Sequence, residues 1–258
     1  MQRKRIHFFL LISLLIAGLP FVLLPLLSTF TRWNFPNLIP QEWGTDNWSF
    51  FFRGQGDIRY SAFITILIAV TTAVIATSVG FFLSRNMIYQ KWSSWGVFFS
   101  FLPVTISPVL FATILAYYFN VGNLSGSILG VILAQLLIAI PFAIIYFTAF
   151  WGSRIRQLEQ LSATLGANAT TTFRQVVFPI ARPFIFVCFF QTFIISWFEY
   201  GMTSVIGSGQ IQTLTIKVFY YVREASPFMA ALSATLLIFP PAILLWFNRQ
   251  FVFKQVSL

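Results

Sequence analysis

Apolar runs long enough to cross a lipid bilayer constrain this sequence more than any other feature. A helix needs about 20 predominantly apolar residues to span the hydrocarbon core, where no water is available to hydrogen-bond exposed peptide groups. The runs that meet this requirement are 6–30, 60–84, 95–119, 127–150, 184–206 and 228–248. The sequence therefore predicts an all-α integral membrane protein with six transmembrane helices.

The composition agrees with a membrane location. Of the 258 residues, 58% are hydrophobic and only 9% are charged, whereas charged residues make up about 25% of an ordinary soluble domain. The 16 basic and 6 acidic side chains are too few to cover the surface of a soluble protein of this length. The apolar side chains, among them 33 phenylalanines, are expected to face lipid or one another.

The first apolar run is expected to be retained as a helix and not cleaved as a signal peptide. It is longer than the roughly 7–15 apolar residues of a signal peptide, and no small-residue cleavage pattern follows it. Residues 31–59 are rich in Trp, Pro and Gly, which is typical of irregular chain lying at the membrane face. Residues 1–59 are thus expected to form one transmembrane helix and an outer loop.

Lysine and arginine are distributed unevenly between the two sides of the predicted bundle. Basic residues in short loops remain on the cytoplasmic side of a membrane. In the six-helix arrangement, 11 of them fall on the side of both termini and 5 on the other, so both termini are predicted to be cytoplasmic. The net charge of +10 is a topology signal that also favours contact with anionic lipid. No nucleic-acid-reading motif accompanies it, and no nucleic-acid partner is expected.

Catalytic and metal-binding chemistry has few candidate residues in this chain. His7 is the single histidine and Cys188 the single cysteine, so the partners for a Ser-His-Asp or Cys-His catalytic centre, or for a His/Cys metal cluster, are missing. The sequence also lacks the G-x-x-x-x-G-K-[ST] motif that cradles nucleotide phosphates. We therefore expect no catalytic residue, no metal, no cofactor and no use of ATP by this chain alone.

The segment between the fourth and fifth runs is the largest on the cytoplasmic side. Its first part carries apolar residues at the spacing of one helical face: Ile155, Leu158, Leu161 and Leu165. Gly166 is expected to end this amphipathic helix in the left-handed conformation that other residues resist. A second short helix is predicted over 170–177, until Pro179 ends it and turns the chain back towards the membrane.

This order of helix, glycine turn, helix and proline resembles the cytoplasmic signature of permeases in binding-protein-dependent ABC importers of type I. That signature is written E-A-A-x-x-x-G, nine residues, then I-x-L-P. With Gly166 as its glycine, the spacing assigns the other positions in order: Gln160, Leu161 and Ser162, then Val176, Phe178 and Pro179. Gln160 stands where the family usually has glutamate and Glu159 lies one place earlier, so which of the two faces the partner stays open.

The resemblance extends over about 60–251 and looks closest to the permeases of polyamine, thiamine and ferric-ion importers. It implies an importer transmembrane domain over this range, with cytoplasmic coupling helices at 155–178. The implied ATPase-coupling residues are Glu159, Gln160, Leu161, Ser162, Gly166, Ala167, Val176 and Pro179.

The resemblance also implies a function and a set of partners. The chain is expected to form the transmembrane path for a small solute, with a polyamine, a thiamine-like compound or ferric ion as candidates, across the bacterial cytoplasmic (inner) membrane. Its implied partners are a separate ATP-binding subunit, a second permease chain that is identical or a sister, an extracytoplasmic solute-binding protein and membrane lipid.

Glu199 is an acidic residue inside the fifth apolar run, within the stretch "ISWFEYG". A charge at mid-membrane depth costs about 2.5–3.5 kcal/mol on insertion scales, so Glu199 is expected to face the bundle interior. Two interpretations remain open: a cavity-lining group on the solute path, or a hydrogen bond that joins neighbouring helices.

Two other classes of membrane protein are alternatives to the permease. An ion-coupled secondary transporter of a small solute needs coupling groups near the midplane, where Glu199 alone is available. A membrane-embedded enzyme needs a catalytic constellation, and the sequence offers none. Copurification of an ATP-binding protein separates the permease from both.

Cysteine labelling tests the predicted orientation. Single cysteines at Gly122 and Ser208, in a chain whose Cys188 is replaced by alanine, are expected to react with an impermeant reagent only from outside. A cysteine at Asn168 is expected to react only from the cytoplasm, because the basic loops remain there. The opposite pattern at any of these positions would contradict the orientation.

Overall fold

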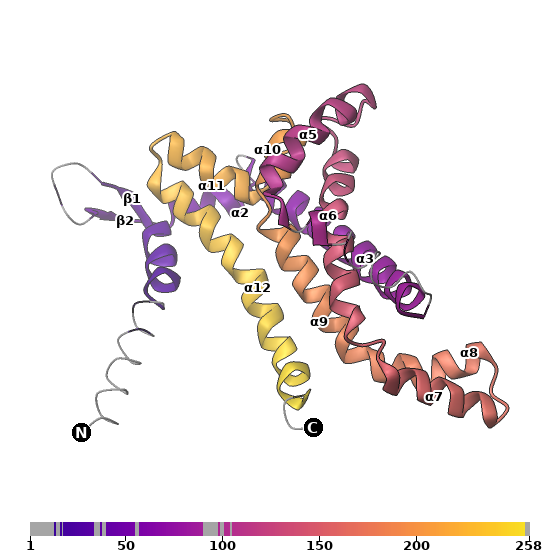
Figure 1. The fold of residues 1–258 in the computed structure, drawn as a ribbon. Helices are drawn as coiled ribbons and strands as arrows, with labels where there is room; N and C mark the ends of the chain where they lie inside the picture. Colours follow the sequence, from indigo (N-terminus) through magenta and orange to yellow (C-terminus); the bar gives the residue numbers. More distant parts are fainter. Residues whose placement is uncertain are drawn as a thin grey trace, which may run out of the picture. The chain divides into compact units, whose positions relative to one another are not determined.

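The computed structural model of the chain consists mainly of helices (Figure 1). It describes residues 18–33, 40–54, 57–89, 101–103 and 105–255, with the single positions 13, 16, 37 and 98, and it describes side chains as far as residue 246. Four of the described helices are long and apolar enough to cross a membrane: Ile58–Tyr89, Ile128–Thr148, Ala169–Trp197 and Pro227–Trp246. The chain divides into two compact units: Met1–Ile64 with Gln212–Ala242, and Thr65–Ile211 with Ile243–Leu258.

The first unit contains a short apolar helix, Gly18–Ser28, that leads into a two-stranded antiparallel sheet. Strand β1 (Phe30–Arg32) pairs with β2 (Glu42–Trp43). The rings of Phe30 and Trp43 pack edge to face across the pair, with centroids 4.5 Å apart. Helix α2 (Asp46–Phe52) follows the sheet.

The prediction of an irregular outer loop over 31–59 is therefore wrong for the described part of that loop. Asn47 of α2 holds the segment together, because its Nδ2 donates hydrogen bonds to the carbonyl oxygens of Ser28 (3.1 Å) and Phe30 (2.8 Å). These bonds satisfy backbone acceptors where the helix ends and the strand begins. The predicted first span, 6–30, accordingly ends as a helix at Ser28, and its beginning lies outside the described residues.

The first unit also contains α11 (Leu214–Arg223) and part of α12 (Pro227–Gln255). Helix α11 is absent from the six-run prediction because its sequence mixes apolar and charged residues. Lys217 of α11 is 4% exposed, and its Nζ lies 3.4 Å from Oδ2 of Asp57. Burial, and secondarily the Asp57 carboxylate, raises the pKa of Tyr221, so this hydroxyl is neutral at physiological pH.

Five helices form most of the second unit: α3 (Ile58–Tyr89) from Thr65 onwards, α5 (Pro108–Val121), α6 (Ile128–Thr148), α9 (Phe178–Trp197) and α10 (Gly201–Ile206). Helices α3 and α6 meet at Gly80, where an added Cβ would lie 2.5 Å from Cβ of Ala143. Small residues permit such close helix approaches in membranes. The hydroxyls of Thr77 and Thr192 lie 3.2 Å apart and join α3 to α9.

The second, fourth and sixth predicted spans are confirmed as helices α3, α6 and α12. The third, 95–119, is not one continuous helix in its described part, because the chain bends at Ile106 before α5 begins. Pro108 disfavours helical geometry in the residue before it, and Ser107 is accordingly extended (φ −57°, ψ 131°). The α5 helix has 14 residues, fewer than a complete span needs.

The fifth predicted span, 184–206, is broken as well. Helix α9 ends at Trp197 and α10 begins at Gly201. Upstream, the expectation that Pro179 would end a short helix is wrong, because the chain is helical continuously from Ala169 to Trp197. Pro179 lies in the first turn of α9, directly after the π-helical turn η1.

Candidate functional site

A helical hairpin extends beyond the ends of α6 and α9 (Figure 1). It consists of α7 (Ser153–Thr164), α8 (Ala169–Thr172) and the π-helical turn η1 (Phe173–Val177). The predicted amphipathic helix is thus present. Its apolar face is anchored by Ile155, which is 6% exposed and packs with Leu158 against a cluster of aromatic side chains.

The turn at the tip of the hairpin has the predicted glycine in a left-handed conformation, with φ +84° at Gly166. The Gly166 N–H donates to the Ala163 carbonyl (3.0 Å) and the Ala167 N–H to the Ser162 carbonyl (3.1 Å). These two bonds form a Schellman motif. The side chain of Asn168 then accepts from the Thr171 N–H (2.8 Å) and caps α8. Turn and caps together fix the shape of the tip.

The structure divides the predicted coupling residues between the tip and its base. Gln160, Leu161 and Gly166 are exposed at the tip, Ala167 is half-buried, and the Ser162 hydroxyl accepts from that of Thr172 (3.1 Å). Leu161 is 57% exposed, and Leu165, one residue before the glycine, is 80% exposed.

The other predicted coupling residues lie away from the turn. Val176 is half-buried in η1, and Pro179 is exposed in the first turn of α9. Glu159 points towards α3: its Oε1 accepts from Nη2 of Arg85 (2.9 Å) and its Oε2 from the Tyr89 hydroxyl (2.8 Å).

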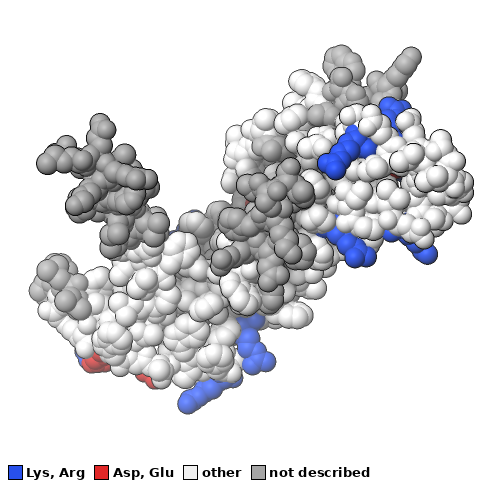
Figure 2. Space-filling view, turned by 90° about the horizontal axis from the view of Figure 1, so that it is seen from below, with Lys and Arg blue, Asp and Glu red and all other residues white. Residues whose placement is uncertain are grey.

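Basic side chains lie on the hairpin and at its base, and Figure 2 shows separate groups of Lys and Arg on the surface of the molecule. The exposed arginines on α7, η1 and α9 are Arg154, Arg156, Arg174 and Arg182. The hairpin therefore combines two exposed leucines with a positively charged surround.

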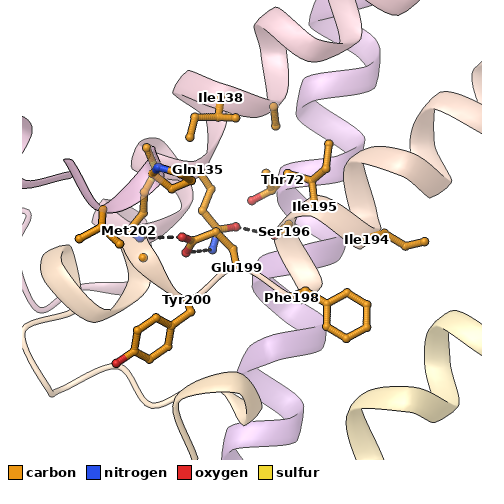
Figure 3. Close-up of a pocket in the computed structure, with 14 residues that line it drawn as sticks. Thr72, Gln135, Ile138, Ile194, Ile195, Ser196, Phe198, Glu199, Tyr200 and Met202 are labelled. Carbon is orange, nitrogen blue, oxygen red and sulfur yellow. Dashed lines mark hydrogen bonds between the residues drawn. The ribbon is translucent and has the colours of Figure 1, made fainter. Parts of the chain in front are cut away.

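A pocket of about 410 Å³ lies within the second unit, at the break between α9 and α10 (Figure 3). Helices α3, α5 and α6 complete its walls, which are mostly apolar. Its polar lining includes Thr72, Gln135, Ser196 and Glu199. The Thr72 side chain is fully buried, and its hydroxyl has no hydrogen-bond partner among the described residues.

Glu199 occupies the break itself, and its carboxylate satisfies the start of α10. Oε1 accepts from the Met202 N–H (2.6 Å), and Oε2 accepts from the N–H (2.9 Å) and hydroxyl (2.7 Å) of Thr203. Gln135 of α6 approaches the same Oε2 at 3.5 Å and donates to the Thr203 hydroxyl at 3.1 Å. The Ser196 hydroxyl donates to Oε1 of Gln135. Glu199 thus lines the pocket and also bonds to neighbouring helices.

Sequence reasoning missed Gln135 and Thr72 as pocket residues, and Arg85 and Tyr89 as partners of Glu159. Gln135 carried a detectable signal, because it is an amide inside the apolar stretch "VILAQLLIAI". Thr72 carried none, since threonine is common in such helices. Within the described part of the chain, no group of three or more His, Cys, Asp or Glu residues is placed to hold a metal ion.

Apolar helices of spanning length, with a hairpin beyond their ends and a pocket among them, are features expected of a membrane transport component. Residues 76–252 match the family described as "Binding-protein-dependent transport system inner membrane component". The chain belongs to this family, which comprises the permeases of ABC importers, and it is a multi-pass protein of the bacterial inner membrane. The resemblance found in the sequence is confirmed.

Individual relatives are distant and named for different solutes. The chain is 23% identical to the spermidine/putrescine permease PotC of Haemophilus influenzae over 246 residues, which cover 92% of this chain and 94% of that protein. It is 25% identical to the molybdenum permease ModB of Mycobacterium tuberculosis over 236 residues, 86% of each chain. It is also 25% identical to a putative ferric permease, FbpB 1 of H. influenzae, over 76% of this chain but only 34% of that protein.

Proposed function

We propose that this chain is the permease subunit of an ATP-driven importer and forms the transmembrane path for a small solute. An extracytoplasmic binding protein delivers the solute, and a separate ATP-binding subunit supplies the energy. The observation that carries the proposal is the hairpin tip, where the exposed Leu161 and Leu165 precede a left-handed Gly166. Exposed leucines on a rigid projecting turn suit insertion of an amphipathic helix into an apolar groove of a partner.

The proposed docking surface includes Gln160 and excludes Glu159. Gln160 is exposed on α7, whereas both carboxylate oxygens of Glu159 bind side chains of α3. Leu161, Ser162, Gly166 and Ala167 complete the tip. Val176 and Pro179 support it from the base, where η1 joins α9.

The proposed topology has six spans and cytoplasmic termini. The shorter helices Gly18–Ser28 and Pro108–Val121 contribute to the first and third spans, beside the four long ones. Residues 60–251 form the importer membrane domain, and 1–59 add one helix with the outer sheet and α2. The excess of basic residues at the ends and at the hairpin supports this orientation.

A second permease chain, identical or a sister, completes the proposed assembly, with one ATP-binding subunit on each. Closure of the two ATP-binding subunits then moves both hairpins. Because α7 is continuous in sequence with α6 and, through α8 and η1, with α9, such movement switches access to the path as a rigid-body transition.

The pocket at the α9–α10 break is the proposed solute path, with Glu199 in its wall. Candidate solutes from the sequence are a polyamine, a thiamine-like compound and ferric ion. Relatives are named for spermidine and putrescine and for ferric ion, but others for sulfate, trehalose and molybdenum. The names alone therefore select no solute.

An ion-coupled secondary transporter was the alternative from the sequence. Such a transporter needs an ion-coupling group, and Glu199 is the candidate from the sequence. Its carboxylate already accepts hydrogen bonds from Met202 and Thr203. Membership of the binding-protein-dependent family favours the ATP-driven class.

Replacement of Gly166 tests the role of the hairpin tip. Gly166→Asp and Gly166→Asn both place a side chain at φ +84°, with a similar strain of roughly 1 kcal/mol. The aspartate alone adds a charge to the docking turn. We expect Gly166→Asp to lose copurification with the ATP-binding subunit, and Gly166→Asn to retain most of it. Wild-type copurification and ATP hydrolysis in Gly166→Asp would remove the basis for assigning the turn a docking role.

Uptake by a Glu199→Gln variant tests the solute path. If the solute is cationic, loss of the carboxylate charge is expected to reduce uptake about tenfold, equivalent to roughly 1.4 kcal/mol. Uptake of radiolabelled spermidine, thiamine and ferric ion is measured beside copurification of the ATP-binding subunit. Glu224→Gln, at an exposed glutamate after α11, is the matched control. Unchanged uptake of every solute that the wild type transports would reject the path role, and loss of assembly would assign Glu199 a structural role instead.

A further inference from the structure

The side of α7 that carries Glu159 contacts the C-terminal end of α3. Glu159 has a side chain that is 15% exposed, and its two oxygens accept hydrogen bonds from Arg85 and Tyr89, one turn apart on α3. Both bonds are shorter than 3.0 Å and involve a charged acceptor, the geometry of strong hydrogen bonds. Removal of Glu159 would leave the partly buried Arg85 cation unpaired.

Aromatic contacts reinforce the same junction. The Arg85 guanidinium lies 5.6 Å from the Tyr89 ring centroid and 5.7 Å from that of Trp151. Trp151 leads into α7 and is 1% exposed, and its indole N–H donates to the Phe81 carbonyl (3.2 Å) and the Ser84 hydroxyl (3.0 Å) of α3. The guanidinium of Arg156, on α7, lies 5.2 Å from the Tyr89 ring centroid. Arg85 thus contacts Glu159 of α7, Tyr89 of α3 and Trp151, which lies between α6 and α7.

The connectivity of the chain gives this junction a specific consequence. Helix α7 continues in sequence from α6 and leads through α8 and η1 into α9, so any movement of the hairpin reaches these two helices through the backbone. Helix α3 has no such connection to the hairpin. Among the described residues, side-chain contacts join it to α7, and Glu159 with Arg85 forms an ion pair at this junction.

We propose that Glu159, Arg85 and Tyr89 form a clamp that makes α3 move together with the coupling hairpin. The proposal rests on the docking role of the hairpin given above and assigns Glu159 a positioning role in place of a docking one. Helix α3 also carries Thr72, in the pocket wall, and Thr77, whose hydroxyl meets that of Thr192 on α9. The clamp therefore transmits movement at the tip to the pocket through a third helix.

Exchange of the charges tests the clamp. Glu159→Arg and Arg85→Glu each place like charges side by side, whereas the double variant restores an opposite pair. This chain carries Cys188→Ala and spin labels on cysteines that replace Asn86 and Gln157. Its complex is purified through a tag on this chain and placed in lipid nanodiscs. Both labelled positions are exposed, one on α3 and one on α7. Distances are measured without nucleotide and after trapping with Mg-ATP and vanadate.

With native Glu159 and Arg85, the clamp predicts a single narrow distribution of distances between the two spin labels. This distribution should be the same without nucleotide and after trapping. Each single exchange should broaden the distribution and shift it on trapping, and the double exchange should restore the narrow distance. Arg154→Gln, which removes a charge from the exposed face of α7, should leave it unchanged. The clamp would be overturned if the distance between the labels changed on trapping in the chain with native Glu159 and Arg85. It would also be overturned if the single exchanges gave the same distance distribution as that chain, or if the double exchange did not restore the narrow distribution.

The same samples separate failure of the clamp from failure of the proposed function. Absence of any ATP-binding subunit from the purified complex would contradict the permease role but not the clamp. In that case the distances measured without nucleotide still test the clamp. The single exchanges must broaden their distribution, and the double exchange must narrow it again. Copurification of the ATP-binding subunit with unchanged distances in both single variants would reject the clamp alone.

Discussion

Satisfaction of backbone N–H groups where a membrane helix breaks is the constraint on which this structure depends. Inside a bilayer no water can replace a lost helical hydrogen bond, so a broken helix needs protein acceptors at the break. Glu199 supplies them, because its carboxylate accepts from the N–H groups of Met202 and Thr203 at the start of α10. The break in turn opens the pocket, whose walls include the residues on both sides of it. An acidic residue, a type that is costly inside a membrane, is thereby used to shape the pocket.

In the hairpin, a turn and a side-chain cap provide hydrogen-bond partners for the backbone groups at the helix ends. A Schellman turn at Gly166 and the side-chain cap of Asn168 satisfy the ends of α7 and α8, while the leucines at the tip remain exposed. On its inner face, Glu159 and Trp151 bind α3. The contacts with α3 at the base and the apolar tip suit an element that binds a partner at its tip and moves together with the helices at its base.

Local patterns in the sequence predicted much of this structure, and long-range pairing accounts for what they missed. Long apolar runs located α3, α6 and α12, and apolar periodicity located α7. The glycine of the turn was identifiable because few other residues adopt φ > 0. The breaks before Pro108 and at Glu199 interrupt apolar runs that hydropathy reads as continuous. The partners of Glu159 lie 70 and 74 residues away, and no local spacing reveals them. For that reason the sequence left the choice between Glu159 and Gln160 open.

A photo-crosslink from the hairpin tip tests the central claim most directly. A photoreactive residue replaces Leu165, which is 80% exposed beside the turn, and a matched one replaces Leu137, 40% exposed on α6. After illumination of cells that express the chain, crosslinked proteins are purified and identified by mass spectrometry. The account predicts that the probe at Leu165 captures an ATP-binding subunit and that the probe at Leu137 does not. Capture of no ATP-binding protein from Leu165, in a chain that still supports solute uptake, would contradict it.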